Sequence, residues 1–108
     1  MMLLRALQRR KPPIRRLILT DNLIGAATIS ECAGPVLTGG LALETLDLSW
    51  NCLPPGAGAE LADALAWNRS LASLALAHNN VGSAGAAFAD ALQHNGTLTA
   101  LDLAANSV

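Results

Sequence analysis

Residues 71–81 read LASLALAHNNV, with apolar residues at the first, fourth, sixth and eleventh positions and asparagine at the ninth. The same spacing recurs three more times: IRRLILTDNLI at 14–24, LETLDLSWNCL at 43–53 and LTALDLAANSV at 98–108. The four copies begin at residues 14, 43, 71 and 98, and are therefore 29, 28 and 27 residues apart. Such regular spacing indicates a stack of similar units, each covering the core of the next.

Each unit is predicted to contain one short strand and one helix. Within residues 71–76 the alternation of Leu74 and Leu76 indicates the strand, which Leu71 enters from the preceding loop. Parallel strands in successive units need a crossover connection, and a helix fits the remaining 16 or so residues. The four asparagines are expected to stack and to satisfy backbone groups that the turn leaves unpaired. They are Asn22, Asn51, Asn79 and Asn106.

The helical halves align in the second and third units, where AELADAL at 59–65 matches AAFADAL at 86–92. Apolar residues four apart should line one face of each helix. Pro54-Pro55 suits the entry to the first of these helices, and Ser83 is placed to cap the second. Gly58 and Gly85 occupy matching positions where a close backbone approach is expected.

The first unit departs from this pattern, because Gly34-Pro35 falls where a helix interior is expected. Proline inside a helix removes a hydrogen bond and costs about 3 kcal/mol or more. We therefore expect a short or irregular segment over residues 26–42. A local specialisation and a poorly packed defect remain open as explanations.

Taken together, these motifs resemble the leucine-rich repeats of the ribonuclease-inhibitor type. The resemblance also includes Asn68-x-Ser70-Leu71 and Asn95-x-Thr97-Leu98, which occupy one repeat position and are expected to be structural rather than glycosylated. It implies an α/β solenoid of about four repeats forming a short horseshoe arc. Parallel strands would line the concave face and helices the convex face. The predicted repeats span residues 14–42, 43–70, 71–97 and an incomplete 98–108.

The N-terminal segment differs in charge from the rest. Residues 1–16 hold six of the seven basic residues, whereas residues 17–108 have one arginine and eight acids, a net charge of −7. Residues 1–13 are interpreted as the remnant helix of a preceding repeat. A targeting segment and a basic tail without its own fold are the alternatives.

Two cysteines are too few for a disulfide framework. The expected localisation is cytoplasmic, with organelle targeting by residues 1–16 as the alternative.

The resemblance implies protein binding, mostly through the concave face. If repeat positions two, three, five, seven and eight face outward, the first two repeats present varied side chains there and the last two mostly alanine. The candidate partner-binding residues are Asp21, Glu44, Asp47, Trp50 and His78. Trp50 should be flanked by Asp21 and His78. It is either an exposed anchor or a cover that shields the asparagines.

The functional prediction is a non-enzymatic protein–protein interaction module with no cofactor, metal, specific nucleic-acid target or membrane span. No nucleophile–base pair, metal-ligand set or phosphate-binding glycine loop stands out in the sequence. The resemblance also permits a GTPase-activating protein of the Ran type. A structural fragment of a longer repeat protein is a further alternative, because the fourth motif lacks a following helix. In that case the exposed last repeat is expected to associate end to end.

Overall fold

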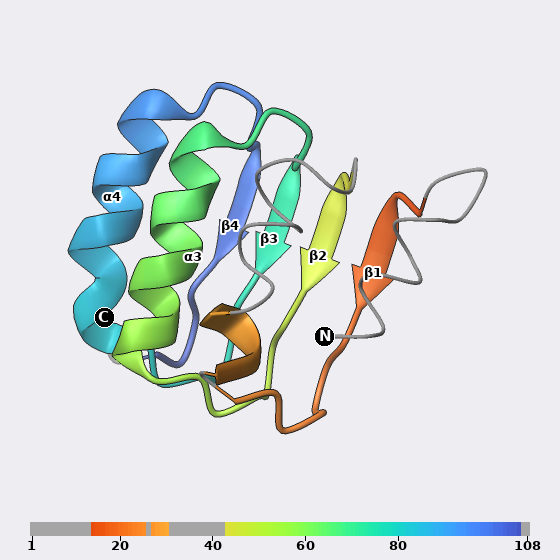
Figure 1. Ribbon diagram of the computed structural model, residues 1–108, viewed down its shortest axis with the longest axis vertical. Helices are drawn as coiled ribbons and strands as arrows, with labels where there is room; N and C mark the ends of the chain where they lie inside the picture. Colours follow the sequence, from red (N-terminus) through yellow and green to blue (C-terminus); the bar gives the residue numbers. More distant parts are fainter. Residues whose placement is uncertain (1–13, 26, 31–42, 107–108) are drawn as a thin grey trace.

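The computed structural model describes residues 14–25, 27–30 and 43–106, and over these residues the predicted solenoid is confirmed (Figure 1). The described strands form one parallel sheet in the order β1-β2-β3-β4, so that each strand pairs with the strand of the next repeat. The elements are β1 (Arg16–Ile18), β2 (Thr45–Asp47), α3 (Pro55–Trp67), β3 (Ser73–Ala75), the 3₁₀ turn η2 (Gly82–Ala84), α4 (Gly85–His94) and β4 (Ala100–Asp102).

Each strand is three residues long, and its middle residue is the leucine at the fourth position of the motif. These four leucines stand in register across the sheet and point toward the helices; they are Leu17, Leu46, Leu74 and Leu101. The two residues beside each of them point to the opposite face and are more exposed. Strand alternation therefore assigns one sheet face to the core and leaves the other available for contacts.

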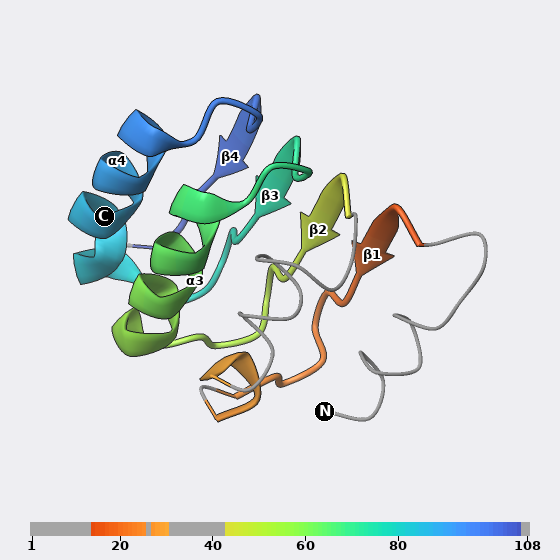
Figure 2. The same ribbon diagram turned by 45° about the horizontal axis from the view of Figure 1, so that its top comes forward.

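Helices α3 and α4 lie side by side on the core face of the sheet (Figures 1 and 2). As predicted, α3 begins at Pro55, because proline already has a helical φ and the first helical N–H needs no partner within the helix. The predicted cap at Ser83 is wrong. Ser83 lies within η2, Ala84 takes the N-cap position of α4, and no side chain caps that helix. The 3₁₀ turn instead satisfies the Ala84 N–H, which donates to the Val81 carbonyl at 2.7 Å.

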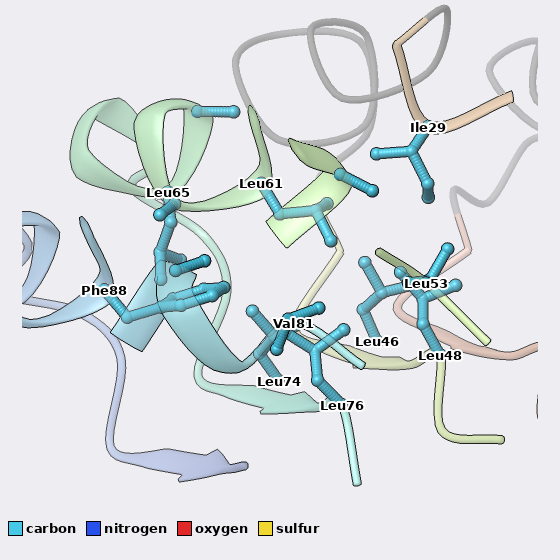
Figure 3. Close-up of a cluster of buried hydrophobic side chains, with 14 of the residues drawn as sticks. Ile29, Leu46, Leu48, Leu53, Leu61, Leu65, Leu74, Leu76, Val81 and Phe88 are labelled. Carbon is cyan, nitrogen blue, oxygen red and sulfur yellow. The ribbon is translucent and has the colours of Figure 1, made fainter. Parts of the chain in front are cut away.

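The core lies between the sheet and these helices and is almost entirely aliphatic (Figure 3). Leu61 and Leu65 line the inner face of α3, as their spacing predicted, and Phe88 is the equivalent anchor of α4. Leu92, the second predicted residue of the inner face of α4, is 43% exposed. Within the described residues α4 has a helix on one side only, so Leu92 lacks the cover that Leu65 receives.

The predicted asparagine ladder is confirmed by hydrogen bonds between repeats. The Oδ1 atom of Asn79 accepts from the backbone N–H groups of Asn51 and Leu53 at 2.9 and 3.0 Å. Its Nδ2 atom donates to the carbonyls of Leu48 and Leu76 at 2.9 and 3.0 Å. Asn51 and Asn106 likewise bind backbone groups of the preceding repeat. Each buried asparagine amide thus joins two repeats, because it binds backbone N–H and carbonyl groups that the turn after the strand leaves unpaired.

A second pair of asparagines closes the loops that follow the helices. Asn68 is buried, and its Oδ1 atom accepts from the N–H groups of Ser70 and Leu71. The Nδ2 atom of Asn95 donates to the Leu65 carbonyl at the end of α3, at 2.8 Å. These contacts support the structural interpretation of both Asn-x-Ser/Thr motifs, because the side-chain amides are already engaged.

Two predictions fall largely outside the described residues. The interpretation of residues 1–13 as a remnant helix lies entirely outside them. The irregular segment expected over residues 26–42 is described only at residues 27–30, which are helical and include the buried Ile29. The division into repeats and the end-to-end association stay predictions.

Candidate functional site on the concave face

The concave face of the sheet is the side opposite α3 and α4, and no helix of the described residues covers it (Figure 2). Outward residues of adjacent strands pair directly, so that Ile18, Asp47, Ala75 and Asp102 form one row across the face. The outward direction predicted for motif positions three and five is confirmed. The prediction for position seven is wrong in the middle repeats, where Ser49 and Ala77 are buried.

Burial at position seven depends on a neighbouring repeat on each side. The carbonyls of Ser49 and Ala77 accept N–H groups from the preceding repeats, from Asp21 at 3.1 Å and from Trp50 at 3.0 Å. Each residue therefore lies in the seam between two repeats. The equivalent residues of the outer repeats, Thr20 and Ala104, are more exposed.

The eighth position of every repeat forms a second row, just beyond the strands. Its members have positive φ angles: 58° at Asp21, 62° at Trp50, 56° at His78 and 56° at Ala105. All four side chains are exposed. A left-handed backbone costs about 1–2 kcal/mol in residues other than glycine. This repeated geometry turns position eight toward solvent even when the side chain is large.

Trp50 stacks on His78 in this row, as their equivalent positions in adjacent repeats suggested. Their ring centroids are 3.8 Å apart and the planes differ by 11°. Trp50 nevertheless remains 54% exposed. The next residue, Asn51, belongs to the asparagine ladder and is 2% exposed. The arrangement favours the anchor interpretation of Trp50, since the indole rests on His78 and keeps much of its surface in contact with solvent.

The carboxylates predicted for this site take different positions. Asp47 lies three residues before Trp50 on the same repeat, and its Oδ1 atom accepts from the Ser49 N–H at 2.9 Å. Glu44 lies one residue before β2 and faces Arg15. The Glu44 Oε2 atom is 3.6 Å from the Arg15 Nε atom, and both side chains are more than half exposed. Asp21 is exposed beside Trp50 in the position-eight row. The structure therefore places Asp21, Asp47, Trp50 and His78 in one region and directs Glu44 toward an arginine.

Ile18 extends this region into the first repeat, and Leu23 is a second exposed apolar side chain of that repeat. Ile18 is 56% exposed and pairs in register with Asp47. Leu23 is 78% exposed and also has a positive φ, 52°. Ile18 was predictable from its outward motif position. Leu23 was missed, because the left-handed turn that exposes it has no signature such as glycine in the sequence.

Other kinds of site find little support in the described residues. They contain no group of three or more His, Cys, Asp or Glu side chains placed to hold a metal ion. Among them, no helix is long and apolar enough to cross a membrane. A shallow hollow of about 180 Å³ lies between α3 and α4, lined mainly by alanines and by Asp63 and Asp90. It lies on the helical side, away from the predicted residues.

Comparisons with known proteins agree with this architecture. A family model described as leucine-rich repeat matches residues 43–62 and 68–88. No curated protein matches the chain. The solved structure of leiomodin-1 actin-binding site 2 is similar, with a TM-score of 0.81 and 21% identity over 91% of this chain. This chain covers 57% of that structure. With its four motifs, parallel sheet and asparagine ladder, the chain has the fold of a leucine-rich repeat solenoid.

Proposed function

We propose that this chain is a non-enzymatic protein–protein interaction module that binds its partner through the concave face. The observation that carries the proposal is the exposed Trp50–His78 stack on the side of the sheet away from α3 and α4. Tryptophan is strongly enriched among the residues that dominate binding energy at protein interfaces. Asp47 and Asp21 add charge that would orient a partner.

The exposed position of Trp50 supports a role in binding. Its left-handed backbone costs about 1–2 kcal/mol, and an aromatic pair is worth about 0.5–1.5 kcal/mol. The stack with His78 therefore offsets about as much as the backbone conformation costs. The same backbone conformation occurs at position eight of the other repeats, at Asp21, His78 and Ala105, so it is a property of the repeat that turns this position toward solvent. A large ring held in an exposed position is consistent with binding.

The comparisons suggest where to look for the partner. The similar leiomodin-1 structure is that of an actin-binding site, so actin is one defined candidate to test. The similarity is one of fold, and a different partner remains compatible with the proposal. The motif pattern further supports assignment to the ribonuclease-inhibitor type of repeat. A cytoplasmic location is also part of this proposal, because two cysteines are too few for a disulfide framework.

The proposal is tested by immobilising the 108-residue chain and incubating it with purified actin and with cell lysate. The variant Asp47→Ala/Trp50→Ala should lose proteins that the unmodified chain retains. Trp67→Ala is the matched control, because Trp67 is 68% exposed but lies at the end of α3. Circular dichroism should confirm that all variants fold alike. Equal retention by the unmodified chain and the double variant would contradict the proposal.

A further inference from the structure

We propose that the concave face recognises an arginine side chain of its partner, held against Trp50 and between Asp21 and Asp47. This inference rests on the proposed function and specifies the chemistry of the partner. It arises from three features that meet at the junction of the first and second repeats. These features are an open aromatic face, carboxylates without a cation, and an exposed aliphatic side chain.

The aromatic face comes from the direction in which Trp50 stacks. His78 of the third repeat covers one side of the indole at 3.8 Å. The neighbour on the other side of the position-eight row is Asp21 of the first repeat, which is exposed. Since Trp50 keeps 54% of its surface exposed, the side toward Asp21 is accessible to a planar group. His78 acts as a support that holds the indole in place.

The carboxylates give this region its charge preference. Within the described part of the chain, neither Asp21 nor Asp47 has an ion-pair partner, whereas Glu44 is paired with Arg15. Asp47 accepts one backbone N–H through Oδ1, which fixes the direction of its carboxylate. A cationic side chain therefore fits the charge of this surface.

Ile18 completes the match to arginine. Its side chain is 56% exposed and stands in register beside Asp47, on the strand that precedes Asp21. The methylene stem of an arginine can cover such an aliphatic surface while its charged group reaches further. Guanidinium is planar and stacks on aromatic rings, and it pairs with carboxylates through two parallel N–H groups. Lysine offers a point charge and no planar face.

The experiment uses the peptide acetyl-Gly-Ser-Arg-Ser-Gly-amide and two analogues in which lysine or neutral citrulline replaces the arginine. Each is titrated into ¹⁵N-labelled protein while ¹H–¹⁵N spectra are recorded. The arginine peptide should shift the indole N–H of Trp50 and the backbone amides of Ile18, Asp21 and Asp47 along a saturable curve. The indole N–H of Trp67 provides an internal control in every spectrum.

Citrulline should weaken binding at least about threefold, since it keeps the planar shape but removes the charge that stacks on the ring and pairs with the carboxylates. Lysine should bind between the two. Trp50→Ala and Asp21→Asn/Asp47→Asn should each weaken the arginine peptide, whereas Trp67→Ala should not. Equal shifts with citrulline, or unchanged binding in Trp50→Ala, would overturn the inference.

The two proposals fail in distinguishable ways. If the arginine peptide produces no saturable shift but a partner is still lost in Asp47→Ala/Trp50→Ala, the concave face binds proteins by other chemistry and this inference is wrong. If the peptide binds as expected but every captured partner is retained by the double variant, the arginine site exists and the proposed function is wrong.

Discussion

Replacing Gly58 by alanine will destabilise the protein, although alanine is the better helix former. Gly58 lies inside α3 and faces the next repeat. A Cβ atom added there would lie 2.7 Å from the Cβ of Val81 and 3.0 Å from the Cβ of Ala84. Both neighbours are buried, so the second and third repeats would have to move apart.

The magnitude follows from two opposing effects. Alanine gains about 0.8–1 kcal/mol over glycine in a helix interior, and overpacking a core costs about 1–3 kcal/mol. We expect a net loss of about 1 kcal/mol for Gly58→Ala. Gly56→Ala is the matched control in the same helix, because nothing lies within 4 Å of an added Cβ there. That variant should be as stable as the unmodified protein or more stable.

The free energies of unfolding can be measured by urea denaturation followed by circular dichroism. The difference between the two variants largely removes the shared helix-propensity effect and isolates the close contact between repeats. If Gly58→Ala proves as stable as Gly56→Ala, the tight packing of α3 against Val81 and Ala84 is not a feature of the folded protein. The description of the repeat interface would then need revision.

Three further substitutions test other parts of the account by the same denaturation assay. Asn79→Ala removes a buried amide that binds five backbone groups, and should cost about 3 kcal/mol or more. Asn22→Ala should cost far less, because Asn22 is exposed and its side chain makes one such bond, and similar losses for the two variants would discredit the ladder. Ala105→Gly should stabilise the protein by up to about 1 kcal/mol by relieving its left-handed backbone, φ 56°; a clear loss would count against that geometry. Glu44→Gln breaks the exposed pair with Arg15 and should change stability by less than about 1 kcal/mol; a larger loss would show that the pair contributes to the fold.

The repeating pattern made the architecture predictable. Because each leucine and asparagine occupies an equivalent place in every unit, one strand and one ladder position predict the others. The hydrogen bonds of Asn51 and Asn79 follow directly from that equivalence. The start of α3 was also predictable, since Pro55 suits only a few helix positions.

Features that depend on a single turn were harder to predict. Ser83 has the chemistry of a cap, but a 3₁₀ turn precedes α4 and places Ala84 at the cap. Ser49 was expected to face outward and is buried, because the first and third repeats flank it on both sides. Side-chain identity does not reveal either arrangement, which depends on local backbone geometry.

The candidate site was predictable as a region and less so in its details. The repeat register places His78 beside Trp50, and the structure stacks the two rings. The sequence left open whether Trp50 is an anchor or a cover. That distinction depends on the positive φ of Trp50. The sequence would have indicated such a backbone conformation only if the residue were glycine. Glu44 was predicted as a contact residue, and its position opposite Arg15 makes it the least favoured member of that set.

The central claim is that the concave face around Trp50 binds a protein partner. Its most direct test is the affinity of a purified captured partner for Trp50→Ala and for Trp67→Ala, measured by isothermal titration calorimetry. We expect at least about tenfold weaker binding for Trp50→Ala, as for a central interface anchor, and unchanged binding for Trp67→Ala. Equal affinities for the two variants would contradict the account, and weakening only in Trp67→Ala would assign the interface to the region around the end of α3.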